Sequence, residues 1–274
     1  MPTIEENRRC WHGEYDWSQQ GEEWSAAWGG SEAQWWGTLM PRIHAFVPCE
    51  TILEIAPGFG RWTMYLKELC RKMTLVDLSE RCITSCRQRF ASSPHLQYFV
   101  NDGKSLAMIE DESMDFVFSF DSLVHAEAEV LETYVTQLAR KLKPNGVAFI
   151  HHSNALRYRK YFAVTTRLPR GRRFLAEKRV ILNDCARALN MSAALFEQYC
   201  VKAGVQCISQ EIINWYDPAL IDCISIFTGK DSEWARPNRI VENRSFVQEA
   251  RNWARVTPLY MRQPFRRPIG NGSV

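Results

Sequence analysis

The stretch Ile52-Leu53-Glu54-Ile55-Ala56-Pro57-Gly58-Phe59-Gly60-Arg61-Trp62-Thr63 decides the fold. It combines an apolar strand, a glycine-containing turn and the start of a helix. Glycine lets the backbone turn sharply and approach a ligand closely, as in the first strand–helix turn of a doubly wound α/β sheet. Thr63 stands where a dinucleotide fingerprint needs its third glycine, and no Gly-Lys-Ser/Thr sequence follows Gly58 as in a P-loop. The turn therefore suits a ligand without a pyrophosphate.

From residue 49 onward, short apolar runs alternate with helical patterns. Strands are expected over Thr51–Ala56, Met73–Val76, Leu96–Val100, Met114–Phe120, Val147–His151, Val205–Trp215 and Leu220–Thr228. Helices are expected over Arg61–Arg71, Glu80–Ala91, Glu129–Leu142 and from a Ser192 cap to about Ala203, with Gly204 ending the last one. Such alternation indicates a parallel sheet with right-handed crossovers. We therefore expect an α/β, Rossmann-like, doubly wound, mostly parallel seven-stranded sheet with helices on both faces.

Composition divides the chain into an arm, a main domain and a tail. Residues 1–48 form an arm or lid rich in tryptophan, and large aromatic side chains at this density are expected to pack on the main domain. The main domain is expected over 49–228 and contains a strongly basic insertion over 154–190. Residues 229–274 form a basic C-terminal tail, expected to be irregular.

Charge and cysteine usage limit the class of protein. The net charge of +3 is weak and makes a general nucleic-acid binder an unfavoured interpretation. We find no apolar run of membrane-spanning length and no signal-peptide pattern, and the nine cysteines are scattered without a Cys-x-x-Cys pair. These observations predict a cytoplasmic protein with reduced cysteines and no zinc knuckle. They are compatible with a homo-oligomer.

Two acidic residues follow the next two strands. Asp77 ends the apolar run Thr74-Leu75-Val76, where a carboxylate can accept hydrogen bonds from ribose hydroxyls. Asp102, in the sequence Val100-Asn101-Asp102-Gly103, is placed to meet an adenine amino group.

Together these motifs resemble those of the class I S-adenosylmethionine-dependent methyltransferases. The resemblance covers about residues 50–152 and includes Met114–Phe120 and Leu138–Val147, which look like the fourth strand and the helix, turn and fifth strand of that family. It implies that Gly58 and Gly60 approach the methionine part of S-adenosylmethionine, that Asp77 holds the ribose and that Asp102 contacts the adenine. The expected cofactor-binding residues are Glu54, Gly58, Gly60, Asp77, Leu78, Asp102, Gly103 and Phe120.

Polar residues at the ends of the fourth and fifth strands are the catalytic candidates. An acceptor hydroxyl must lose its proton, and histidine is the natural base near neutral pH. His152 or His125 could serve as that base, with Asp121 orienting it or binding the acceptor. Strand alternation puts His151 and His152 on opposite faces, so at most one of them is expected to be catalytic. A Mg²⁺ ion held by Asp121, His152 and another carboxylate is a further hypothesis, although no compact metal motif supports it.

Motifs after residue 190 indicate the chemical class of the methyl acceptor. Met191–Phe196, Gln210–Trp215 and Leu220–Cys223 resemble class I methyltransferases associated with bacterial glycan assembly. This resemblance implies O-methylation of a sugar hydroxyl in a saccharide or glycoconjugate. Trp36, His151, Asn154 and Tyr158 are the expected substrate-binding residues. The cations of the insertion suit a lid over a phosphate-bearing acceptor, or a solvated loop.

Three other functions stay open. The first is a methyltransferase for a small natural product or lipid. The second is a nucleic-acid methyltransferase, although Ser119-Phe120-Asp121-Ser122 stands where the Asn/Asp-Pro-Pro-Tyr/Phe motif for amine methylation is expected. The third is a cofactor-binding module that regulates a partner without catalysis.

Overall fold

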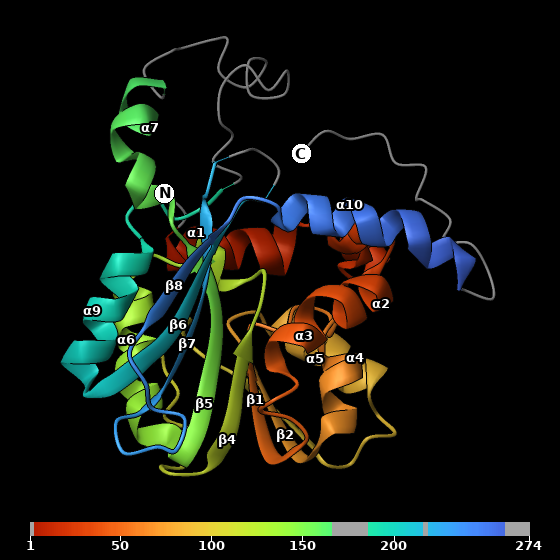
Figure 1. Cartoon of the computed structure of the whole chain (residues 1–274). Helices are drawn as coiled ribbons and strands as arrows, with labels where there is room; N and C mark the ends of the chain where they lie inside the picture. Colours follow the sequence, from red (N-terminus) through yellow and green to blue (C-terminus); the bar gives the residue numbers. More distant parts are fainter. Residues whose placement is uncertain (1–2, 166–185, 216–218, 261–274) are drawn as a thin grey trace.

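The computed structural model describes residues 3–165, 186–215 and 219–260. One sheet has the strand order β3-β2-β1-β4-β5-β7-β6-β8 (Figure 1). The strands are β1 Cys49–Ile55, β2 Cys70–Asp77, β3 Leu96–Val100, β4 Met114–Ser119, β5 Leu142–Ser153, β6 Val205–Ile213, β7 Asp222–Gly229 and β8 Arg239–Asn243. β7 runs antiparallel to its neighbours β5 and β6, and the other pairs are parallel. The expected Rossmann-like, mostly parallel sheet is confirmed, with eight strands where seven were predicted.

Helices cover both faces of the sheet. α6 (Ala128–Lys141) and α9 (Ala193–Ala203) lie together on one face, and α4 (Thr63–Leu66) and α5 (Glu80–Arg89) lie on the other (Figure 1). Apolar residues at helical spacing on α6 are buried in the core between that helix and the sheet. α9 begins where the Ser192 side chain accepts the N–H of Leu195 and ends at Gly204 (φ +78°), as the cap pattern predicts.

The helix after the glycine turn is shorter than predicted. The sequence pattern extends it over Arg61–Arg71, whereas α4 and a following 3₁₀ turn end at Leu69. β2 begins at Cys70, which pairs with Cys49 of β1. Residues from Cys70 onward, which helical periodicity predicted to be helical, therefore form a strand because they pair with β1.

The C-terminal tail is ordered over part of its length, which corrects the prediction of an irregular segment. β8 adds a parallel edge strand to β6, and α10 (Phe246–Val256) follows it. Phe246 and Ala250, one helical turn apart, are fully buried. The Phe246 ring lies 5.9 Å from the rings of Trp28 and of Trp215, so this helix forms by burying one apolar stripe.

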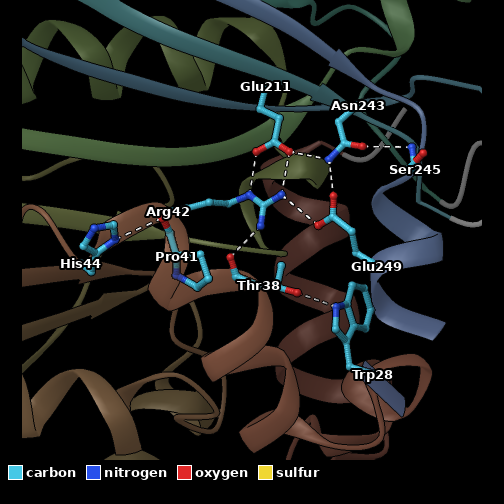
Figure 2. A network of polar contacts seen from close by, with 9 residues as sticks. All are labelled: Trp28, Thr38, Pro41, Arg42, His44, Glu211, Asn243, Ser245 and Glu249. Carbon is cyan, nitrogen blue, oxygen red and sulfur yellow. Dashed lines mark hydrogen bonds and ion pairs between the residues drawn. The ribbon is translucent and has the colours of Figure 1, made fainter. Parts of the chain in front are cut away.

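The N-terminal arm packs on the main domain, as its tryptophans predict. It contains α1 (Ile4–Arg8), α2 (Ser31–Gln34) and α3 (Met40–Ile43), and it lies with α10 across one end of the sheet (Figure 1). Figure 2 shows its anchor: the Arg42 guanidinium donates to both Glu211 carboxylate oxygens of β6 at 2.6 and 2.7 Å. It also donates to Glu249 of α10 at 3.2 Å and to the Thr38 carbonyl at 2.8 Å. One cation therefore joins the arm to the far strands and to the last helix.

Part of the basic insertion is described. A 3₁₀ turn over Ala155–Tyr158 leads into α7 (Arg159–Thr165). Residues 166–185, which contain most of the cations on which the lid hypothesis depends, lie outside the described residues. No helix in the described ranges is long and apolar enough to cross a membrane.

Candidate functional site

A cavity lies where β1, β2 and β4 end, between the sheet and the N-terminal arm. Its sheet-side wall comes from the turn after β1, from Asp77 and Leu78, and from residues 120–123. Its opposite wall comes from arm residues that include Ile4, Trp11 and Trp17. In open α/β sheets ligands bind beyond the carboxyl ends of the strands, and this cavity has that position.

Asp77 lies on the cavity wall at the end of β2. Its carboxylate accepts the N–H of Ser79 at 2.8 Å and the N–H of Gly58 at 3.2 Å, which connects the second strand to the glycine turn. Burial raises the pKa of Asp77 to about 6, although these N–H donors oppose the rise. A carboxylate has more acceptor positions than these two bonds use, so it can also accept hydroxyl hydrogen bonds from a ligand.

The two glycines of the turn have different roles. Both have positive φ, +59° at Gly58 and +83° at Gly60, which favours glycine. Gly58 lines the cavity, and a Cβ there would lie 2.9 Å from the Trp17 ring of the arm. A Cβ at Gly60 would lie 2.5 Å from the Phe90 ring, and Gly60 does not line the cavity. Gly60 therefore lets α5 pack closely on the turn, which corrects the prediction that it contacts the cofactor.

Glu54 lies within the core and does not line the cavity. It is 1% exposed, and the Thr63 hydroxyl donates to its carboxyl at 2.5 Å. Burial raises the pKa of Glu54 to about 8, so this side chain is mostly protonated at neutral pH. Glu54 supports the turn by joining β1 to α4, which corrects the prediction of direct cofactor contact.

Asp102 and Gly103 differ in their position relative to the cavity. Gly103 and Leu78 line the cavity, and a Cβ at Gly103 would lie 2.8 Å from the Ile4 side chain of the arm. The Asp102 carboxylate is exposed and accepts the N–H groups of Lys104 and Ser105 at 3.0 and 2.7 Å. Asp102 therefore stabilises its own turn and does not line the cavity, which corrects its prediction as a cofactor-binding residue.

Asp121 lines the cavity at the end of β4, and its backbone has a left-handed conformation. Its φ is +61°, and the neighbouring end of β1 has φ +57° at Ala56. Non-glycine residues in this region cost of order 1 kcal/mol and are concentrated at functional sites. The Ser122 hydroxyl donates to the Ala56 carbonyl at 2.8 Å, which ties the two strand ends together. Asp121 and Phe120 both line the cavity. The catalytic role of Asp121 and the cofactor contact of Phe120 stay predictions.

Arg61 is a cavity residue that the motif reading did not single out. It directly follows Gly60, and its side chain donates to Asp121 at 2.9 Å and to Ser25 of the arm at 3.0 Å. Its guanidinium carbon lies 5.2 Å from the Trp24 ring centre and 4.4 Å from that of Trp62. A cation in the glycine turn was visible in the sequence, but its partners come from segments 36 and 60 residues away.

His125 also lines the cavity, and its imidazole has a defined polar contact. Its Nδ1 lies 2.9 Å from the Ala186 carbonyl, which requires Nδ1 to carry the proton and leaves Nε2 as an acceptor. The Trp11 ring lies 5.4 Å from the imidazole, and the His125 carbonyl accepts the Asn7 amide at 3.0 Å. Burial, with a contribution from Arg187, lowers the pKa of His125 to about 4.

His152 is remote from the cavity, which corrects its prediction as the base. It is fully buried on the α9 side of the sheet, stacked 4.4 Å from Phe196. Its Nδ1 lies 2.9 Å from the Ser153 carbonyl and its Nε2 lies 2.8 Å from the Ser225 hydroxyl. Burial lowers its pKa to about 3. A substrate cannot reach a side chain that is buried and hydrogen-bonded at both nitrogens.

His151 points to the opposite face, as strand alternation predicts, and lies behind the cavity wall. It is fully buried, and its Nδ1 accepts the backbone N–H of Asp121 at 3.0 Å. Asn154 and Tyr158 are structural in this arrangement, because the Asn154 amide and the Tyr158 hydroxyl bond to the Leu220 backbone. Trp36 is 59% exposed and lies away from the cavity lining. These four residues were predicted to bind substrate, and none of them lines the cavity.

The described residues contain no cluster of three or more His, Cys, Asp or Glu side chains that could hold a metal ion. Asp121 faces the cavity, whereas His152 lies on the α9 side of β5. The ligand pair predicted for Mg²⁺ is therefore not formed.

Residues 52–146 match a family model described as "Methyltransferase domain". The chain is 27% identical over 100 residues to Nodulation protein S of Sinorhizobium fredii, a match that covers 36% of this chain and 45% of that protein. It is 25% identical over 114 residues to Phosphoethanolamine N-methyltransferase 1 of Caenorhabditis elegans, covering 42% and 23%. The chain thus spans less than half the length of these curated relatives.

A solved structure shares the fold. The PH0226 protein of Pyrococcus horikoshii superposes with a TM-score of 0.52 at 20% identity, over 70% of this chain and 88% of that chain. The sheet order, the glycine turn and the family match agree over the same segment. Residues 52–146 of the chain thus match a methyltransferase domain, and the sheet around them has the fold of the Pyrococcus horikoshii protein.

Proposed function

We propose that the chain is an S-adenosylmethionine-dependent methyltransferase whose acceptor binds between the sheet and the N-terminal arm. The observation that carries the proposal is the Asp77 carboxylate, buried on the cavity wall and bonded to the N–H of Gly58 within the matched domain. When bound, S-adenosylmethionine supplies a methyl group on a sulfonium that an in-line nucleophile can attack.

The residues around the cavity fit this cofactor. Asp77 would accept the ribose hydroxyls, and the apolar wall formed by Leu78, Gly103 and Val130 would receive the adenine. The Gly58 turn would accommodate the methionine part. The arm residues Ile4 and Trp17 pack on Gly103 and Gly58, so the arm would cover the cofactor and exclude water.

The acceptor is proposed to be a sugar hydroxyl of a saccharide or glycoconjugate. The rings of Trp11, Trp17 and Trp24 line the cavity, and sugar faces stack on aromatic rings. His125 replaces His152 as the proposed base, because its Nε2 is an acceptor and its ring lines the cavity. The cations of α7 and of the insertion could bind a phosphate group, so the proposal includes an acceptor that carries a phosphate.

An amine is the second candidate acceptor. Asp121 and Glu127 line the same cavity as three tryptophans, and acidic and aromatic side chains together bind ammonium groups. A weak base such as His125, with a pKa near 4, is a poor match for a hydroxyl but is not needed by a neutral amine. The relatives include a protein named as an N-methyltransferase, which supports the same candidate.

A radiolabel transfer screen tests the proposal. Purified chain with methyl-tritiated S-adenosylmethionine would be offered nucleotide sugars, oligosaccharides, glycolipids and small amines, with the Asp77→Ala variant as control. We expect transfer to one class and its loss in the variant. Transfer to an amine that increases with pH, as the ammonium loses its proton, would select the second candidate. Failure of calorimetry to detect binding of S-adenosylmethionine or its demethylated product would overturn the proposal.

A further inference from the structure

We propose that His151 is a positioning residue that holds Asp121 in the cavity wall from the buried side. The inference rests on the proposed function, because Asp121 matters for the reaction only if the cavity binds the acceptor. Its physical basis is a chain of contacts that begins at the strained peptide of Asp121 and ends at a buried ion pair on β7.

The first contact fixes the backbone of Asp121. Its φ of +61° turns the residue out of the direction of β4, and its N–H points away from solvent toward the Nδ1 of His151 at 3.0 Å. Few residues other than glycine adopt this conformation without compensation. The imidazole therefore supplies the hydrogen-bond acceptor that the turned peptide needs, and sheet pairing does not supply it.

The second set of contacts fixes the imidazole. His151 is fully buried, stacked 4.6 Å from the Phe120 ring and tilted against the Trp215 ring at 5.3 Å. Because Nδ1 accepts a hydrogen bond, the proton of the neutral ring is on Nε2. That nitrogen lies 3.6 Å from the Asp222 carboxylate, a distance longer than a hydrogen bond but favourable for an N–H facing a negative charge.

The third contact holds Asp222. It is fully buried at the start of β7, and Arg187 donates to its two carboxylate oxygens at 3.1 and 2.9 Å. Although burial alone would raise the pKa of Asp222, the Arg187 guanidinium lowers it overall, so the carboxylate is charged. A charged acceptor behind Nε2 favours the tautomer that leaves Nδ1 free to accept from Asp121.

Asp121 is held from the cavity side as well. Its carboxylate pairs with Arg61 at 2.9 Å, and Arg61 also bonds to Ser25 of the arm. The peptide is thus fixed from behind by His151 and the carboxylate from the front by Arg61. Without the imidazole, the buried N–H of Asp121 would have no acceptor, and the residue would relax toward negative φ and move its carboxylate.

Three variants test the role of His151. His151→Phe keeps a flat ring and removes the acceptor, whereas in His151→Asn the side-chain oxygen can occupy the position of Nδ1. His152→Phe is the matched control, because it makes the same change at the next residue, which is equally buried and faces the other side of β5. Thermal unfolding of all three accounts for any loss of folded protein.

The kcat and the hydrogen exchange of the Asp121 amide are both expected to change in His151→Phe. In His151→Phe the kcat per folded molecule should fall by about 10–100-fold, because small misplacements of a positioned group cost rates of that order. The affinity for S-adenosylmethionine should stay unchanged. His151→Asn should recover most of the rate, and His152→Phe should keep the rate of the wild type. Hydrogen exchange of the Asp121 amide should accelerate in His151→Phe but not in His152→Phe.

The exchange readout does not require an acceptor, so it tests the inference even if the proposed function fails. Unchanged protection of the Asp121 amide in His151→Phe would overturn the inference. Equal loss of kcat in His151→Phe and His152→Phe would also overturn it, since that result indicates general disturbance of β5. A wild-type chain that binds no S-adenosylmethionine would refute the proposed function alone.

Discussion

Arg61 and Asp121 form an ion pair with an N–O distance of 2.9 Å, and their side chains are only 5% and 8% exposed although both line the cavity. Arg61 belongs to the turn that follows β1, and Asp121 follows β4. Through Ser25, Arg61 also contacts the arm. Arg61 therefore connects the glycine turn both to Asp121, the candidate catalytic carboxylate, and to the N-terminal arm.

Breaking this pair should destabilise the fold strongly. Arg61→Met or Asp121→Asn leaves one buried charge without its partner, which costs about 3–5 kcal/mol. The double variant should lose less than the sum of the two single losses, because it removes both charges. Urea unfolding of all four proteins measures the coupling. Strictly additive losses would show that the two side chains do not interact in solution.

Cofactor affinity should depend on the ionisation of Asp77. The pKa of Asp77 is about 6 in the fold, and ribose hydroxyls donate to the charged carboxylate. Affinity for S-adenosylmethionine should therefore be constant above pH 7 and fall below pH 6, by up to about tenfold per pH unit. Asp77→Asn should bind more weakly and remove this dependence. Calorimetry between pH 5 and 8 measures both.

Asp102→Asn is the control for that series. Asp102 is exposed and bonded within its own turn, so its variant should keep the pH dependence and an affinity close to that of the wild type. A loss as large as that of Asp77→Asn would mean that the turn rearranges to place Asp102 on the cofactor, as the sequence resemblance implied.

Glu54 should make stability fall as pH rises. Its pKa is about 8 in the fold, against 4.5 as its reference value, so the folded state holds the proton more tightly than the unfolded state. The folded state therefore loses stability between about pH 4.5 and 8. Glu54→Gln, which is neutral at every pH, should be close to the wild type near pH 5 and more stable by about 4 kcal/mol near pH 8.5. Urea unfolding at the two pH values measures the difference, and parallel pH profiles would contradict a buried, protonated Glu54.

The two candidate histidines should differ in kinetic effect. If the acceptor is a hydroxyl, His125→Ala should lower kcat by about 10²–10⁴-fold, because the variant removes the proton acceptor in the cavity. The rate should decrease as pH falls through about 4, where His125 takes up a proton. His152→Ala should affect stability and leave the rate per folded molecule almost unchanged. Steady-state rates corrected for folded fraction decide between them, and a larger loss in the His152 variant would restore the original prediction.

Anchoring of the arm should depend on Arg42. Arg42→Met removes the partner of Glu211 and Glu249 in the partly buried network of Figure 2, and should cost about 1–3 kcal/mol. Lys202→Met is the control, because its ion pair with Glu132 involves a 73% exposed lysine and should contribute less than about 1 kcal/mol. Thermal unfolding measures both, and equal effects would show that the arm is held by its tryptophans alone.

Local patterns were enough to predict the elements around the glycine turn at Gly58. The strand from Ile52, the turn at Gly58 and the acid at Asp77 follow one another closely, and backbone propensities and glycine geometry act over that range. The order of these elements was also enough to predict a mostly parallel sheet. The predicted end of the helix was wrong where strand pairing competed with helical periodicity. Cys70 pairs with Cys49 of β1 and therefore belongs to β2.

The positions of the candidate acceptor-binding and catalytic side chains could not be predicted in the same way. His152 and His151 are adjacent in the sequence, yet one packs on Phe196 beneath α9 and the other accepts the peptide of Asp121. Trp36 is exposed, whereas Trp17 lies against Gly58. Burial of a side chain depends on which segments cover it, and those segments are far away in the sequence.

The sequence by itself determined that this chain folds as a doubly wound α/β sheet with a glycine turn and an acid at the ends of its first two strands. Strand and turn formation depend on residues close to one another in the chain. Only the tertiary structure decided that Arg61 faces the cavity, and that His125 lines it whereas His152 does not. Those positions result from the packing of the arm and α9 against the sheet and from the pairing of β7 with β5. Contacts between such distant segments leave no periodic pattern in the sequence.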